Sequence, residues 1–194
     1  MEYRLLGKTN LKVSRLGIGL VKIGNAEMLT QLHKSDLLLN TALDSGINFL
    51  DTAACYGNSE EVIGKTVSHR RDEYILASKA GHSVEQLNGE PWTAETIINS
   101  VERSLKRMNT EYLDLIQLHT CDVKTLANGE VIDALLHLKT TGKTRFIGYS
   151  GDEEAAEWAV KSNIFDTLQT SLNLVDQHSL RYIAAAHKND MGVI

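Results

Sequence analysis

The stretch Leu38-Leu-Asn-Thr-Ala-Leu-Asp-Ser-Gly-Ile-Asn-Phe-Leu-Asp51 contains the structural unit that the chain repeats. Apolar side chains share one predicted helical face at Leu38, Leu39, Ala42 and Leu43. Gly46 is the expected C-terminal stop of this helix. The apolar run Ile47 to Leu50 then predicts a buried strand, which makes the unit a helix followed directly by a strand.

The same alternation of strand and helix patterns runs along the whole chain. The predicted strands are Ser14 to Leu20, Ile47 to Leu50, Tyr74 to Ala77, Leu113 to Leu118, Phe146 to Tyr149, Thr167 to Leu172 and Gly192 to Ile194. Six helices alternate with them. The helices after the first are predicted around Val62, Ile63 and Val67, around Ile97, Val101, Leu105 and Met108, and over Val131 to Leu138, Glu153 to Val160 and Leu180 to His187. Asn58 with Glu61 predicts a capping box for the second helix, and Thr93 an N-cap for the third.

Strict alternation of strands and helices predicts an α/β fold with parallel strands and right-handed crossovers. An open dinucleotide-binding sheet is disfavoured, because the glycines of Gly17-Ile-Gly-Leu-Val-Lys-Ile-Gly24 lack the G-x-G-x-x-G spacing. A closed (β/α)8 TIM barrel needs about 250 residues. We therefore expect residues 1–194 to form one incomplete barrel domain of about seven strands and six helices, which ends before the eighth strand.

An additional element precedes the first repeat. Tyr3 to Leu6 and Leu11 to Val13 flank Gly7-Lys-Thr-Asn10, a pattern that predicts a β-hairpin. This N-terminal hairpin is expected to plug the N-terminal end of the barrel.

Composition excludes several classes of function. The formal net charge of -5 gives no basic surface for nucleic acid. The chain has two cysteines, which favours a reducing compartment over a disulfide framework. The start Met1-Glu-Tyr-Arg4 lacks the apolar core of a signal peptide, and no apolar run approaches the length of a membrane span. We expect a cytoplasmic protein that acts on a small molecule without nucleic acid or membrane as partner.

Polar residues end four of the apolar strands. They are Asp51, Lys79, His119 and Ser150. The C-terminal ends of the strands in a barrel meet at one mouth, where the active sites of this fold lie. An acid, an amine and an imidazole that share a half-buried mouth shift one another's pKa values.

Tyr56 lies five residues beyond Asp51, in the loop above the second strand. A tyrosine there is a candidate general acid if a cation lowers the pKa of its phenol. Lys79 is the candidate cation, held by Asp51, and His119 would orient a substrate carbonyl or share the proton.

These residues carry a resemblance to a known family. Asp51-Thr-Ala-Ala-Cys-Tyr-Gly57 matches the aldo-keto reductase pattern D-T-A-x-x-Y-G. Ser78-Lys79 and Leu118-His119 match the next two signatures of that family, in order and spacing. Leu5-Leu-Gly-Lys-Thr-Asn-Leu-Lys-Val-Ser14 resembles its N-terminal hairpin. The resemblance covers essentially the whole chain.

The resemblance implies an oxidoreductase that reduces aldehydes or ketones with NADPH, or with NADH in its place. The implied catalytic residues are Asp51, Tyr56, Lys79 and His119, and Tyr56 would protonate the carbonyl oxygen. The implied cofactor contacts are Asp51, Ser150, Gly151 and Gln169, and the family commonly has Asn at the position of Gly151. The cofactor supplies the hydride, and the protein supplies position and electrostatics.

Other functions remain open. The same fold serves as a cofactor-sensing regulatory subunit, and the 194 residues could be an inactive fragment. A metal-dependent barrel hydrolase would draw ligands from Asp51, His119, Cys121 and Asp122, but only one histidine lies at a strand end, so no metal is expected. Cys55 and Cys121 are interpreted as ordinary thiols.

Overall fold

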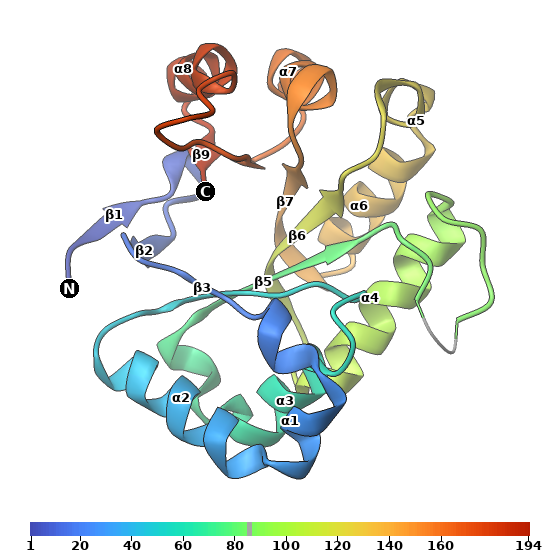
Figure 1. Ribbon diagram of the computed structural model, residues 1–194. Helices are drawn as coiled ribbons and strands as arrows, with labels where there is room; N and C mark the ends of the chain where they lie inside the picture. Colours follow the sequence, from blue (N-terminus) through green and yellow to red (C-terminus); the bar gives the residue numbers. More distant parts are fainter. Residues whose placement is uncertain (85–86) are drawn as a thin grey trace.

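A seven-stranded parallel sheet curls around a central interior in the computed structural model, which describes residues 1–84 and 87–194 (Figure 1). The strands follow one another in sequence order. They are β3 (Ile18–Gly19), β4 (Phe49–Asp51), β5 (Ile75–Ala80), β6 (Leu113–His119), β7 (Thr144–Ser150), β8 (Thr167–Gln169) and β9 (Gly192–Val193). Sequence order with parallel pairing is the arrangement of a (β/α)8 barrel, so the fold is an incomplete barrel of this kind.

Helices cover the outside of the sheet (Figure 1). The principal ones are α2 (Leu32–Asp44), α3 (Ser59–Thr66), α4 (Ala94–Met108), α6 (Glu130–Thr140), α7 (Glu153–Ser162) and α8 (Leu180–Lys188). Two short helices, α1 (Ala26–Thr30) and α5 (Val123–Asn128), were not predicted. Among the residues described, no helix combines the length and the apolar character that crossing a bilayer would require.

Alternate residues of each strand face the helices or the interior. Leu50, Leu76 and Ile116 face outward, and their side chains belong to the large core under the helices. The residues between them face inward. Toward the N-terminal ends of the strands the interior is apolar, with Phe49 and Leu115 in one cluster. The polar inward-facing residues lie nearer the C-terminal ends.

The N-terminal hairpin covers the apolar end of the interior. It consists of β1 (Tyr3–Leu5) and β2 (Lys12–Ser14), paired antiparallel as predicted. Leu6, Leu11 and Val13 pack against the inward-facing side chains of the strands. The amide of Lys8 donates to the carbonyl of Asp190, 2.6 Å away, which places the hairpin beside β9 (Figure 1).

The sheet does not close on itself within the described residues. β3 and β9 are its two edges, and each has one neighbouring strand. A cavity of about 650 Å³ opens between them, and it is lined by residues of the hairpin, of β3, of β9 and of the chain just before β9.

Four local predictions were wrong. The first strand of the sheet is Ile18–Gly19 and not Ser14 to Leu20, because Ser14 instead pairs with Tyr3 at the end of β2. Leu38 is 47% exposed, because the buried face of α2 passes through Leu39, Ala42 and Leu43. The capping box fails because Asn58 has ψ 6°, away from the extended conformation of an N-cap, and Glu61 instead pairs with Lys65 at 2.8 Å.

The fourth wrong prediction is the length of β8. This strand ends at Gln169 and does not continue to Leu172. The carboxylate of Asp152 accepts from the Thr170 hydroxyl at 2.6 Å and from the Ser171 amide at 2.8 Å, and these bonds turn the chain out of the sheet.

Asp114 lies at the start of β6, is 1% exposed, and holds together a network of buried hydrogen bonds whose contribution to stability can be tested. Its carboxylate accepts from Arg71 at 2.8 Å, from Arg145 at 2.7 Å and from the Leu76 amide at 2.9 Å. Asp114→Ala should lower the free energy of unfolding by about 3 kcal/mol, because it leaves buried donors unpaired. Urea denaturation measures this.

Lys65→Ala is the control, because its pair with Glu61 lies on the surface and should contribute less than about 0.5 kcal/mol. Equal losses in the two variants would contradict a structural role for the Asp114 network.

Candidate active site

The polar residues at the strand ends come together at one end of the sheet. Asp51 ends β4, Lys79 is the penultimate residue of β5, and His119 ends β6. The register pairs His119 with Ser150 and Ser150 with Gln169, so these residues lie at the same level of three neighbouring strands.

Asp51 and Lys79 form a buried ion pair. The Lys79 Nζ lies 2.5 Å from the Asp51 Oδ1 and donates a second bond to the carbonyl of Thr52 at 3.1 Å. The side chain of Lys79 is 2% exposed and that of Asp51 is 13% exposed. A buried ammonium group is stable only with a close anion and further acceptors, so Asp51 and the Thr52 carbonyl fix the place of the charge.

Tyr56 approaches this pair from the loop that follows β4. The centre of its ring lies 5.5 Å from the Lys79 Nζ and 5.7 Å from the ring of His119. Burial raises the pKa of the Tyr56 phenol, and the charge of Asp51 raises it further. The expectation of a lowered pKa is therefore wrong, because burial and the charge of Asp51 both raise it. The phenol keeps its proton at neutral pH.

The loop that carries Tyr56 is held on both sides. On one side it lies against Gly24, whose carbonyl accepts from the Asn58 amide at 2.9 Å. On the other side the Arg107 guanidinium of α4 donates to the carbonyl of Gly57 at 2.7 Å. These bonds anchor the backbone on the C-terminal side of Tyr56.

His119 is neutral in this environment. Burial, the charge of Lys79 and the neighbouring His82 lower the pKa of His119 to about 4. The Nδ1 of His119 lies 3.5 Å from the Cys55 sulfur, and the ring of His82 packs at 4.8 Å. His82 in turn contacts Trp92, at 4.7 Å between ring centres. A neutral imidazole can donate a hydrogen bond without adding charge to the site.

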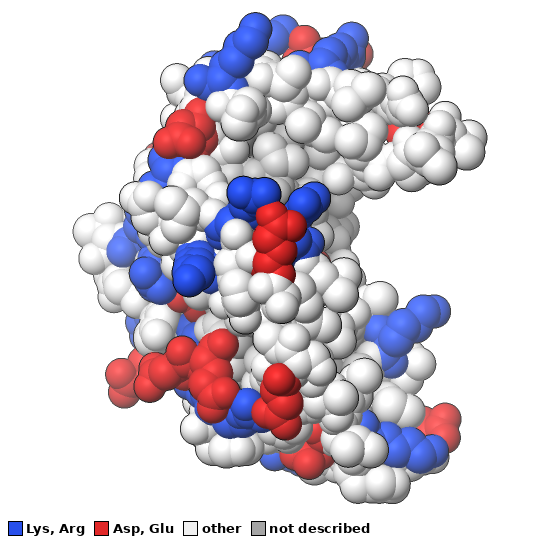
Figure 2. Space-filling model, turned by 90° about the vertical axis from the view of Figure 1, so that its left-hand side faces the viewer, with Lys and Arg blue, Asp and Glu red and all other residues white. Residues whose placement is uncertain are grey.

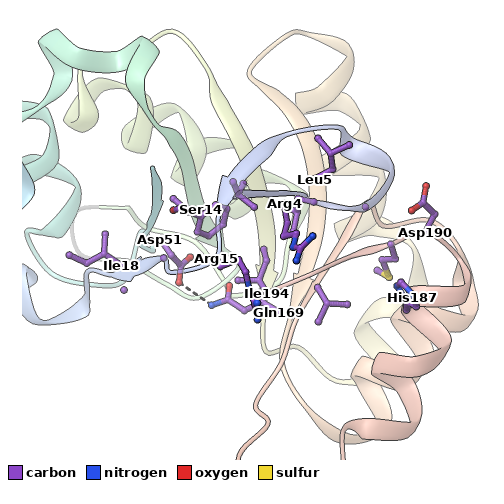
Figure 3. A pocket seen from close by; sticks show the side chains of 18 residues that line it. Arg4, Leu5, Ser14, Arg15, Ile18, Asp51, Gln169, His187, Asp190 and Ile194 are labelled. Atoms are coloured by element: carbon purple, nitrogen blue, oxygen red, sulfur yellow. Dashed lines mark hydrogen bonds between the residues drawn. The ribbon is translucent and has the colours of Figure 1, made fainter. Parts of the chain in front are cut away.

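Gln169 points toward Asp51 in the interior (Figure 3). Its Nε2 donates to the Asp51 Oδ2 at 3.0 Å, and its Oε1 accepts from the Gln117 Nε2 at 2.7 Å. Ser150 is buried beside Gln169.

Gly151 has a steric reason to be glycine. A Cβ at this position would lie 2.7 Å from the Tyr149 hydroxyl, which donates to the carbonyl of Cys121 at 2.7 Å. The family's common Asn at this position would therefore meet the ring of Tyr149.

The cavity between β3 and β9 reaches this site from the side. Asp51 and Gln169 are among the residues that line it, together with Ile18 and Ile194 (Figure 3). Tyr56, Lys79 and His119 are not among them, so the cavity meets the site at the Asp51 carboxylate. Figure 2 shows the molecule from the side with a hollow in its outline, and charged side chains lie on the face turned to the viewer.

The candidate metal ligands have other partners. Asp51 pairs with Lys79, and Asp122 accepts from the Thr125 amide at 2.8 Å as the N-cap of α5. Cys121 is buried, and burial raises the pKa of its thiol to about 12. Within residues 1–84 and 87–194, no three His, Cys, Asp or Glu side chains gather as a metal site would require.

Gln117, His82 and Trp92 also belong to the surroundings of the site, although they were not predicted. Gln117 is the one polar residue inside the apolar run Leu115 to Leu118, and this interruption is the sequence signal that marks it. His82 and Trp92 have no comparable signal, because the contact of His82 with His119 and that of Trp92 with His82 exist only in the folded chain.

The description of one protein family fits this chain. The model of the aldo/keto reductase family matches residues 15–194. The chain belongs to this family. The matched residues include all seven strands of the parallel sheet.

Similar proteins are named as oxidoreductases. An uncharacterized oxidoreductase of Bacillus subtilis, YqkF, is 32% identical over 100% of this chain and 63% of its own length. The L-galactose dehydrogenase of Arabidopsis thaliana is 36% identical over 78% of this chain and 49% of its own length. The chain thus spans less than two thirds of either curated relative.

A solved structure shares the fold. It is a putative aldo-keto reductase from Pseudomonas aeruginosa, with a TM-score of 0.89 and 33% identity. The match covers 98% of this chain and 76% of that one.

Gly24 tests how the Tyr56 loop is held. A Cβ there would lie 2.0 Å from the carbonyl oxygen of Tyr56. Gly24→Ala should lower the free energy of unfolding by about 1–3 kcal/mol, because neither backbone segment can move aside easily. Gly19→Ala is the matched control, since nothing lies within 4 Å of its added Cβ. If both variants melt at the same temperature, the contact does not hold the loop.

The lowered pKa of His119 predicts that the stability of the fold depends on pH. Its pKa is about 4 in the folded chain and 6.5 in the reference state, so between these values the unfolded chain binds more protons. The free energy of unfolding should therefore fall as the pH falls from about 6.5 to about 4.

His119→Gln should make this fall shallower in urea denaturation at a series of pH values. His33→Gln, on the exposed surface of α2, is the matched change elsewhere. An unchanged slope in His119→Gln would rule out a buried neutral imidazole.

Proposed function

We propose that this protein reduces aldehydes or ketones to alcohols with a reduced nicotinamide cofactor, and that Tyr56 is the general acid. The observation that carries the proposal is geometric: the ring of Tyr56 lies 5.5 Å from the Nζ of the buried Asp51–Lys79 pair and 5.7 Å from the ring of His119. Membership of the aldo/keto reductase family supports the same reaction class.

Tyr56 supplies the proton in this proposal. A phenol with a raised pKa is protonated at neutral pH and can transfer its proton to a carbonyl oxygen as negative charge develops there. The Lys79 ammonium lies 5.5 Å from the ring and stabilises the phenolate left behind. Asp51 keeps this ammonium in place.

His119 orients the substrate in this proposal. Because its pKa is lowered to about 4, it is a neutral donor at the pH where Tyr56 holds its proton. A hydrogen bond from this ring to the carbonyl oxygen would polarise the carbonyl without competing as an acid.

The donor set at the ends of β7 and β8 fits a nicotinamide carboxamide. A carboxamide offers one acceptor oxygen and two donor hydrogens, and it needs neighbours of both kinds. Ser150 and Gln169 provide a hydroxyl and an amide side by side, and Gly151 leaves the adjacent backbone free of a side chain. When bound, the reduced nicotinamide supplies the hydride.

NADPH is the proposed cofactor, and a small carbonyl compound is the proposed substrate. NADH remains a second possibility for the cofactor. Cys55 and Cys121 are free thiols, which supports a cytoplasmic location.

Tyr56→Phe tests the proposal. It should lower kcat at least about a hundredfold and leave the Kd of NADPH nearly unchanged, because it removes the proton donor and little contact area. Steady-state turnover of 4-nitrobenzaldehyde measures kcat, and a titration followed by NADPH fluorescence measures the Kd of NADPH. Tyr112→Phe, at the opposite end of the sheet, is the control and should retain activity.

Three results would contradict the proposal. Undiminished turnover in Tyr56→Phe would exclude Tyr56 as the acid. Tight NADPH binding by the unchanged protein without any turnover would favour the cofactor-sensing function. Activity that a chelator abolishes and a metal restores would favour a hydrolase.

A further inference from the structure

Gln117 is a fully buried amide in the interior of the barrel. It lies on β6 between Lys79 of β5 and Gly148 of β7 in the register, and its exposed fraction is 0%. A polar side chain in such a place costs desolvation free energy unless it is hydrogen-bonded. Gln117 precedes His119 by two residues on β6, so both side chains lie on the same face of the strand. Gln117 is therefore part of the wall under the candidate site.

A continuous chain of hydrogen bonds starts at Gln117. Its Nε2 donates to the Gln169 Oε1 at 2.7 Å. The Nε2 of Gln169 donates to the Asp51 Oδ2 at 3.0 Å. The other oxygen of Asp51 holds Lys79 at 2.5 Å. The chain thus joins side chains from four strands and ends on the ammonium group beside Tyr56.

The direction of this chain is forced by chemistry. An ionised carboxylate can only accept, so Gln169 must turn its NH2 group to Asp51. The carbonyl of Gln169 then faces Gln117, which must donate in its turn. The Oε1 of Gln117 is left without a partner among the described residues, so the bond to Gln169 decides how this amide is oriented.

We propose that Gln117 is a positioning residue for the candidate site: it locks the amide of Gln169 so that Gln169 donates to Asp51 and Asp51 holds Lys79. This inference rests on the proposed function. Without Gln117, the buried carbonyl of Gln169 loses its donor, and the Gln169 side chain is no longer fixed in the position from which its Nε2 reaches the Asp51 Oδ2. Asp51 then loses the hydrogen bond that fixes the rotation of its carboxylate against Lys79.

Thr167 provides a matched control. It faces the same interior layer on β8, is 0% exposed, and its hydroxyl also has no partner in the described part of the chain. Its Oγ1 packs over Gly148, where an added Cβ would lie 2.2 Å away. Thr167 makes no bond to Gln169, so Thr167→Val changes a buried polar group of this layer without touching the chain of bonds.

The kinetic test uses Gln117→Leu, Gln169→Leu and the double variant with 4-nitrobenzaldehyde and NADPH. Gln117→Leu should lower kcat about tenfold with KM for the aldehyde unchanged, since the proton donor is misplaced and the aldehyde contacts remain. The double variant should be no worse than Gln169→Leu, because Gln117 acts through Gln169. Thr167→Val should stay within about twofold of the unchanged protein. The proposal would be overturned if the losses of kcat in the two single variants multiplied in the double variant, or if Gln117→Leu raised KM alone. An equal loss of kcat in Thr167→Val would overturn it as well.

An activity-independent test separates this inference from the proposed function. In urea denaturation, Gln117→Leu and Asp51→Asn should be non-additive by about threefold or more in the unfolding equilibrium constant. The coupling should vanish in a Gln169→Leu background. Additive effects would overturn the relay. A protein that shows the coupling but reduces no aldehyde would sustain the relay and disprove the reductase function.

Discussion

The buried pair of Asp51 and Lys79 is the constraint on which the rest of the site depends. An ammonium group that is 2% exposed loses nearly all its hydration, and this cost is met by one close carboxylate and one backbone carbonyl. Because the two residues lie on neighbouring strands, the sheet itself sets their distance. Each other polar group at the mouth must then adapt to a fixed, internally neutralised pair of charges.

The neighbouring groups adapt by staying neutral. The phenol of Tyr56 has a raised pKa and the imidazole of His119 a lowered one, so both are uncharged at neutral pH. Burial is the largest cause in both cases. The site therefore contains one ion pair and two neutral groups that can donate protons or hydrogen bonds. This arrangement is suited to proton transfer.

The two ends of the barrel interior have different roles. Its N-terminal end is apolar and covered by the hairpin through Leu6, Leu11 and Val13, so it contributes stability. Its C-terminal end carries the polar residues on short strand ends and in the Tyr56 loop, where the backbone is held by Gly24 and Arg107. This separation lets the polar end be shaped by single side chains without loss of the core.

The sequence by itself determined the order of strands and helices, the hairpin, and the identity of the strand-end residues Asp51, Lys79 and His119, because these depend on local periodicity and on where apolar runs stop. Only the tertiary structure decided the orientation of Gln169, the neutral state of Tyr56 and the contact of His82 with His119. Local patterns also misplaced the cap of α3 and the end of β8. The physical reason is the same in each case: hydrogen bonds, burial and charge act between residues distant in sequence, and their distances exist only in the folded chain.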